Sequence, residues 1–76
     1  MLMIKVLIVD DSLVQQELLS HILTRDSGIE IVGIASDGKE ACKKVLSLKP
    51  DVITMDIHMP EMNGIDATIE IMSTWI

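Results

Sequence analysis

Short apolar blocks recur along the chain, separated by longer amphipathic stretches. Three of the blocks are rich in Val, Ile and Leu and are bounded by polar residues, which predicts buried β-strands. These blocks are residues 4–9, 30–35 and 52–55. The first is the most continuously apolar, whereas the second contains Glu30 and Gly33. We therefore expect the first strand to be central in a sheet and the second to lie at an edge.

The stretches after each block repeat apolar residues three or four positions apart, which is typical of amphipathic helices. They predict helices over residues 13–25, 38–48 and 64–74. Ser12 and Asp37 precede the first two helices, and Gln15 and Glu40 follow them at the spacing of a capping box. The apolar positions at helical spacing are Val14, Leu18, Leu19, Ile22 and Leu23 in the first helix, Ala41, Val45 and Leu48, expected to face inward, in the second, and Ile65, Ile69 and Met72 in the last.

The order of these elements is βαβαβα, which predicts an α/β fold with three parallel strands and right-handed crossovers. With the first strand central and the second at an edge, the strand order is 2-1-3. The chain then leaves the first strand toward one side while the third strand lies on the other. In open α/β sheets, ligands bind at the carboxyl ends of the strands at such a switch point.

Carboxylates follow two of the strands directly. Asp10 and Asp11 come after the first strand, and Asp56 comes after the third. In the order 2-1-3 these three side chains converge in one crevice. Two carboxylates about 4 Å apart repel by roughly 4 kcal/mol at an effective dielectric constant near 20. A shared proton or a bound cation would relieve this repulsion.

An all-oxygen set without His or Cys side chains favours Mg²⁺, which binds few carboxylates, keeps several waters and leaves positions for phosphate oxygens. A carboxylate in such a site can also act as a nucleophile toward a phosphoryl group. The alternative is that each aspartate is only a turn or cap residue, as aspartates after strands often are. That explanation is weaker for the three together than for any one of them.

Composition narrows the class of protein. The chain has 76 residues, 49% hydrophobic and 24% charged, which predicts one small globular domain of marginal stability. A net charge of −6 with only six scattered Lys and Arg argues against nucleic-acid binding. No apolar run is long enough for a membrane span. The single Cys42 excludes an internal disulfide, and we expect a cytoplasmic location.

Three segments together resemble the receiver domain of bacterial two-component response regulators. They are VLIVDDS, DGKEA and KPDVITMDIHMPEMNG, and the similarity extends to about residue 72. The last segment, continued as IDATIEIM, is most similar to the receiver of the chemotaxis protein-glutamate methylesterases. The resemblance implies a flavodoxin-like fold, a sensor histidine kinase as phosphodonor and Mg²⁺ as cofactor.

The resemblance also implies a role for each matching position. Asp56 matches the phosphoacceptor aspartate, which is also a metal ligand. Asp11 matches a direct Mg²⁺ ligand, and Asp10 matches one that holds the metal mainly through water. The backbone carbonyl of His58 matches the third protein ligand. No side-chain metal role is expected for His21, and Cys42 is expected to be a packing residue.

The family domain has five βα units, whereas residues 1–76 contain three. We therefore expect the N-terminal part of a receiver, without the Ser or Thr and the Lys that bind the phosphoryl group in the family. Phosphorylation would then be impaired, and no esterase activity is expected of these residues. The third strand would become an open edge, which predicts a homodimer through residues 52–55 or through the uncovered faces.

Two functions remain open from the sequence. One is a phosphoacceptor receiver in histidine-to-aspartate signalling. The other is a non-phosphorylating interaction module that dimerises and keeps a vestigial acidic pocket. A phosphatase of the haloacid dehalogenase type is set aside because it needs Asp-x-Asp after a strand, and His58 stands two places after Asp56.

Overall fold

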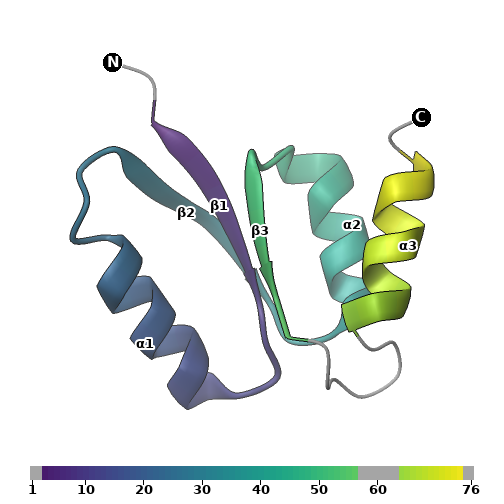
Figure 1. The fold of residues 1–76 in the computed structure, drawn as a ribbon, viewed down its shortest axis with the longest axis horizontal. Coiled ribbons are helices and arrows are strands. Elements are labelled where there is room, and N and C mark those ends of the chain that lie inside the picture. The colour runs from purple at the N-terminus through teal and green to yellow at the C-terminus, as the bar shows by residue number, and fades with distance from the viewer. Residues whose placement is uncertain (1–2, 57–63, 75–76) are drawn as a thin grey trace.

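The sheet has three parallel strands in the predicted order. The computed structural model describes residues 3–56 and 64–74, with side chains to residue 72. The strand β1 (Ile4–Val9) lies between β2 (Ile29–Ala35) and β3 (Val52–Met55) (Figure 1). Both pairings are parallel. The α/β class and the 2-1-3 order are therefore confirmed.

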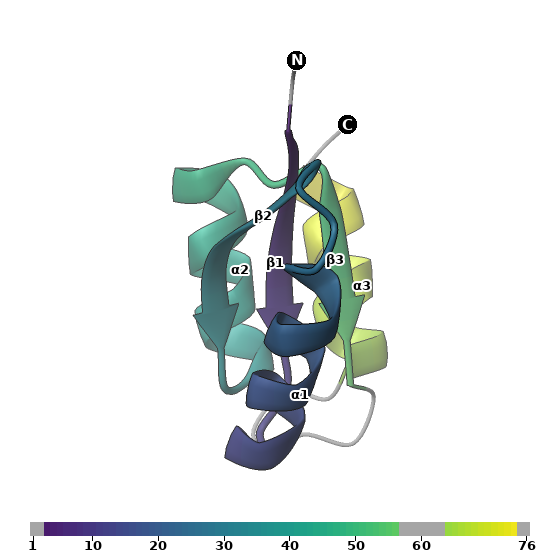
Figure 2. The same cartoon turned by 90° about the vertical axis from the view of Figure 1, so that its left-hand side faces the viewer.

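Three helices cover the sheet on two sides. The helix α1 (Leu13–Leu23) lies on one face, and α2 (Gly38–Leu48) and α3 (Gly64–Thr74) lie side by side on the other (Figures 1 and 2). The bounds of α2, α3, β1 and β3 agree with the prediction. The first helix ends two residues earlier than predicted, and β2 begins one residue earlier.

The core lies between β1 and α2. Leu7 and Val9 of β1 are fully buried, and they form a cluster with small or branched residues of β2, α2 and α3. The other members of the cluster are Ala35, Ala41, Val45 and Ile71. Val6 and Ile8 are buried as well, and by the alternation of strand side chains they face α1. From Val6 to Val9 the central strand is thus buried on both faces, as its apolar sequence predicts, while Ile4 and Lys5 at its start are exposed.

The pairing of β1 with β2 contains a one-residue irregularity. Val6 pairs with Ile31, but the next residue of β1, Leu7, pairs with Gly33. Val32 is therefore an extra residue in β2, and the alternation of this strand reverses there. Gly33 consequently lies under α2, where an added Cβ would stand 2.7 Å from Leu48 Cδ1.

Both predicted N-caps are present, although the reciprocal half of each capping box is different. Ser12 Oγ accepts a hydrogen bond from the Gln15 amide at 3.3 Å, and Asp37 Oδ1 accepts one from the Glu40 amide at 2.8 Å. Glu40 Oε1 accepts from the amide of Ser36 instead of that of Asp37. The amide of Ser12 donates to Asp10 Oδ1 instead of to Gln15.

The apolar residues that recur at helical spacing in α1 are only partly covered by the sheet. Val14, Leu18 and Ile22 are exposed, Val14 to 75%. Leu19 and Leu23 are half-buried. The helix packs on β1 and β2, which form a narrow surface, so only one edge of its wide apolar arc is covered.

The apolar positions named for α3 also face solvent. Ile65, Ile69 and Met72 are exposed, while Ala67 and Ile71 are buried. The helix packs mainly against α2, and its small alanine permits the close approach. The inward residues predicted for α2 are confirmed, with Ala41 and Val45 buried and Leu48 packed against the core.

We expect Leu7→Ala to lower the free energy of unfolding by about 2–5 kcal/mol, because it leaves a cavity in the centre of the sheet. The matched control is Leu46→Ala, at a side chain that is 62% exposed on α2. Urea denaturation followed by circular dichroism measures both variants. Equal transition midpoints for the two variants would contradict the proposed core.

Candidate metal and phosphoacceptor site

The carboxyl ends of the three strands are held together by main-chain hydrogen bonds. The Asp10 amide donates to the Ala35 carbonyl at 3.0 Å, and the Asp56 amide donates to the Val9 carbonyl at 3.0 Å. Each bond extends the sheet ladder one residue past the end of a strand. The backbones of Asp10 and Asp56 are therefore positioned by the most buried strand of the molecule.

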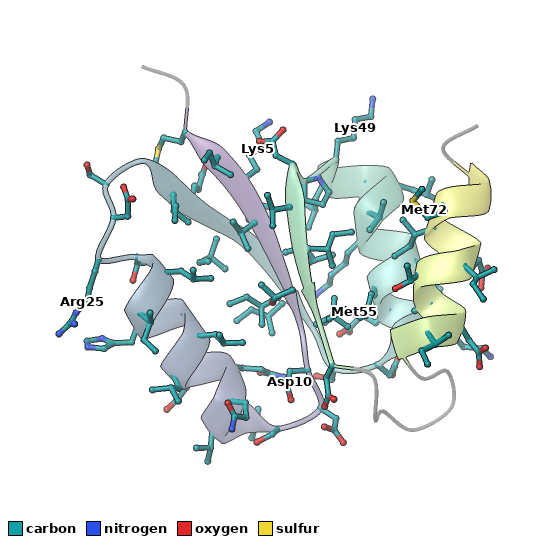
Figure 3. The ribbon with its side chains drawn as sticks, viewed as in Figure 1. Lys5, Asp10, Arg25, Lys49, Met55 and Met72 are labelled. Atoms are coloured by element: carbon teal, nitrogen blue, oxygen red, sulfur yellow. The ribbon has the colours of Figure 1, made fainter. Side chains whose placement is uncertain are left out.

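Three carboxylates meet at this end of the sheet. Asp10, Asp11 and Asp56 each offer one oxygen, and these oxygens lie within 4.8 Å of one another. Asp10 and Asp56 are half-buried, and Asp11 is exposed. Figure 3 shows Asp10 at the end of β1, whereas Lys5 and Lys49 lie at the opposite end of the sheet. The convergence of the three carboxylates, predicted from the strand order, is observed.

Asp10 is fixed by its neighbours more firmly than its exposure suggests. Its Oδ1 accepts a hydrogen bond from the Ser12 amide at 2.9 Å. Its main-chain carbonyl accepts one from Gln16 Nε2 at 2.6 Å. One Asp10 oxygen is thus already bonded, while the Asp11 side chain is exposed to solvent.

Gln16 is the residue that sequence reasoning missed. Gln16 is 6% exposed. In the described part of the chain it is the one polar residue that is buried. The signal in the sequence is weak: Gln16 shares a helical face with Leu19 and Leu23, which are the half-buried leucines of α1. The competing apolar stripe from Val14 to Ile22 obscures this face.

The donor set fits a small divalent cation. Mg²⁺ binds oxygen at about 2.1 Å, so two ligands on opposite sides of the ion are about 4.2 Å apart. The observed limit of 4.8 Å between the carboxylate oxygens is close to this span. Small rotations of the side chains would bring the oxygens around one ion. Carboxylate ligands without nitrogen or sulfur suit Mg²⁺, Ca²⁺ or Mn²⁺.

The remaining candidates lie outside the site or outside the described residues. His58, whose carbonyl was predicted as a ligand, is not among the described residues. His21 is exposed on α1 and does not join the carboxylates. Burial raises the pKa of the Cys42 thiol above its ordinary value of 9.0, and a hydrogen-bonded, negatively charged Glu70 raises it further. The thiolate is disfavoured, which agrees with a packing role for Cys42.

Comparison with known proteins identifies the family. The model of the response regulator receiver domain matches residues 6–75. This match spans the sheet, all three helices and the acidic cluster. The chain belongs to the response regulator receiver family. Receiver domains use Mg²⁺ at an acidic pocket, and they accept phosphoryl groups from sensor histidine kinases.

The curated relatives are protein-glutamate methylesterases/protein-glutamine glutaminases. The chain is 57% identical over 70 residues to protein-glutamate methylesterase/protein-glutamine glutaminase 1 of Syntrophus aciditrophicus, covering 92% of the chain and 20% of the relative. It is 59% identical over 70 residues to the corresponding protein of Methanococcus maripaludis, covering 92% and 19%. The chain therefore spans about a fifth of the length of the curated relatives that it matches.

Solved receiver structures share the fold closely. The response regulator domain of Thermotoga maritima CheB is 49% identical with a TM-score of 0.92, over 93% of this chain and 53% of that one. A CheX–CheY–BeF3–Mg²⁺ complex from Borrelia burgdorferi is 39% identical with a TM-score of 0.88, over 96% and 55%. In the described part of the chain, no helix has the length and apolar character needed to cross a membrane.

We expect Asp11→Asn to raise the free energy of unfolding in metal-free buffer by roughly 0.5 kcal/mol at low ionic strength, because it removes one of three repelling charges. The gain should disappear in about 1 M NaCl, where screening is strong. Urea titrations in EDTA measure the effect. Glu17→Gln, which removes a charge elsewhere on α1, is the control, and an equal gain in both variants would refute a local repulsion.

Proposed function

We propose that this chain is a phosphoacceptor receiver in histidine-to-aspartate signalling and that Asp56 is the residue phosphorylated. The observation that carries the proposal is the meeting of Asp10, Asp11 and Asp56 at the carboxyl end of a parallel sheet. The phosphoacceptor is bonded through its amide to Val9, so its carboxylate starts from a fixed backbone. Such preorganisation is the main contribution that a protein makes to phosphoryl transfer.

The proposed reaction is a displacement at phosphorus. An oxygen of the ionised Asp56 carboxylate forms a bond to the phosphorus of a phosphohistidine on a sensor kinase. The bond from phosphorus to the imidazole nitrogen breaks, and that nitrogen takes up the electron pair and a proton. A bound Mg²⁺ would neutralise the negative charge on the phosphoryl oxygens and on the carboxylates.

The contacts around the pocket support a division of roles. Asp11 has an exposed carboxylate, which suits direct contact with the ion. One oxygen of Asp10 is bonded to the Ser12 amide, which leaves the other for a ligand water. The His58 carbonyl is proposed as a further ligand from the family resemblance. The similar Borrelia burgdorferi complex contains both Mg²⁺ and BeF3, which supports a metal-dependent pocket in this chain as well.

The wider setting is also a proposal. The names of the relatives support the proposal that the chain belongs to the receiver of a protein-glutamate methylesterase. From the family resemblance we propose that it is the N-terminal part of that receiver and that it works in chemotaxis, in the cytoplasm. Residues 1–76 contain three of the five βα units of the family. We propose that these residues alone are phosphorylated weakly, because the family's phosphate-binding Ser or Thr and Lys have no counterpart in them.

Incubation with acetyl phosphate and Mg²⁺ should add one phosphoryl group to a minor fraction of the chains, which intact-mass measurement detects. EDTA should abolish the addition, and so should Asp56→Asn, which removes the nucleophilic oxygen. Beryllofluoride with Mg²⁺ should shift the amide resonances of Asp10 and Asp11 in the wild type only. An unchanged mass and spectrum, identical to those of the Asn variant, would exclude the phosphoacceptor function.

A second candidate function is a dimerising module that retains the pocket without phosphorylation. The observation that favours it is the open edge of β3, which pairs only with β1 among the described strands. Val52 on this strand is exposed. Beside it, β3 and α3 form an apolar groove lined by Asp51, Ile53, Met55, Thr68, Ile71 and Met72. Exposed edges of this kind pair with other strands unless charge or geometry prevents it.

Light scattering at micromolar concentration should give twice the 8.4 kDa mass of one chain if the edge associates. Val52→Lys places a charge beside the edge and should return the mass to that of the monomer. Leu46→Lys, at an exposed leucine of α2, is the control and should leave the dimer intact. A wild-type mass of 8.4 kDa would rule out this alternative.

A further inference from the structure

A buried amide lies directly behind the acidic cluster. Gln16 of α1 is 6% exposed, in contrast to Gln15 and Glu17 beside it, which face solvent. Its Nε2 donates to the main-chain carbonyl of Asp10 at 2.6 Å and lies 3.5 Å from Ser36 Oγ, in the loop after β2. A glutamine in the inward face of a helix loses hydration, so its contacts must compensate for that loss.

The shorter of these two contacts falls on the peptide group that joins the two aspartates. The Asp10 carbonyl belongs to the peptide between Asp10 and Asp11, so a bond to that oxygen restricts rotation about the backbone on both sides. The amide of Asp10 donates to the carbonyl of Ala35, and the Oδ1 of Asp10 accepts from the amide of Ser12. With Gln16 added, every polar group of Asp10 except one carboxylate oxygen has a bonded partner. The Asp10 carboxylate therefore leaves the turn in a set direction, and the peptide from which Asp11 starts is held as well.

We infer that Gln16 is a positioning residue for the metal pocket: its buried amide holds the Asp10–Asp11 peptide so that the two carboxylates face Asp56. Gln16 touches no metal or phosphoryl group itself and acts through Asp10. The inference rests on the proposed metal-binding function of the pocket. Partners behind the ligands of a metal site typically control affinity, because they hold the ligands in the geometry that the ion demands.

The geometric demand of the ion provides a specific signature. Mg²⁺ requires nearly ideal octahedral coordination, whereas Ca²⁺ accepts irregular coordination at longer distances. Loss of the Gln16 bond should therefore weaken Mg²⁺ binding more than Ca²⁺ binding. A residue that only stabilises the fold would not change the ratio of the two affinities in the folded protein.

The test uses Gln16→Met, which keeps the length and burial of the side chain and removes the donor. The dissociation constants for Mg²⁺ alone and Ca²⁺ alone are measured from amide chemical shifts. We expect the Mg²⁺ constant to rise about tenfold and the Ca²⁺ constant to rise less. Gln16→Asn, whose shorter amide is withdrawn from Asp10, should do the same and serves if the Met variant does not fold. Val45→Ala, a core change on the other side of the sheet, is the control for lost stability.

A second readout needs no metal. Hydrogen exchange at the Ser12 amide, corrected for global stability, should be faster in Gln16→Met than in Val45→Ala. Unchanged metal affinities and exchange in Gln16→Met would overturn the inference, while loss of binding in Asp11→Asn would still uphold the proposed function. If the wild type binds neither ion but exchange at Ser12 increases in Gln16→Met, the metal function fails and the positioning of the loop stands.

Discussion

The pairing of β1 with strands on both of its edges is the constraint on which the molecule depends. Its residues Leu7, Ile8 and Val9 have essentially no exposed surface, and the ladder continues beyond its end into Asp10 and Asp56. A backbone can be buried away from water only when its amide and carbonyl groups are hydrogen-bonded to neighbours. The hydrogen bonds that pair the backbone groups of β1 therefore also bring Asp10 and Asp56 close together.

At the carboxyl end of the sheet, backbone hydrogen bonds hold together three carboxylates that repel one another. The carboxylates repel, and the lysines labelled at the other end of the sheet are too distant to compensate. The hydrogen bonds described for Asp10 and for the backbone of Asp56 come from neutral groups: the Ser12 amide, the Gln16 amide and the strand ladder. A site held by neutral groups retains its negative potential, whereas a site held by arginine or lysine would lose much of its attraction for a cation.

The strands, the order 2-1-3 and the convergence of the three aspartates could be predicted because they follow from continuous apolar blocks and the rules for parallel crossovers. The burial of α1 could not. Its apolar residues cover a wide arc, and only the tertiary surface decides which part is covered. The burial of Gln16 could not be predicted for the same reason. A polar residue on the inward face of a helix interrupts the apolar pattern from which that face is predicted. The family was predictable from VLIVDDS and the segment around Asp56, although the role of each site residue remains a proposal.

The extra residue in β2 has a consequence for the layer on the far side of the sheet. Because the alternation reverses at Val32, Gly33 and Ala35 pair with Leu7 and Val9 and turn the smallest side chains of the strand toward α2. A regular strand would have turned Val32 and Ile34 there instead. Side chains of the helix come so close to position 33 that a methyl group added there would require the Leu48 side chain to move. In related sequences that share this irregularity, residues on the exposed side of α2 should vary far more than the residues of β2 that face α2.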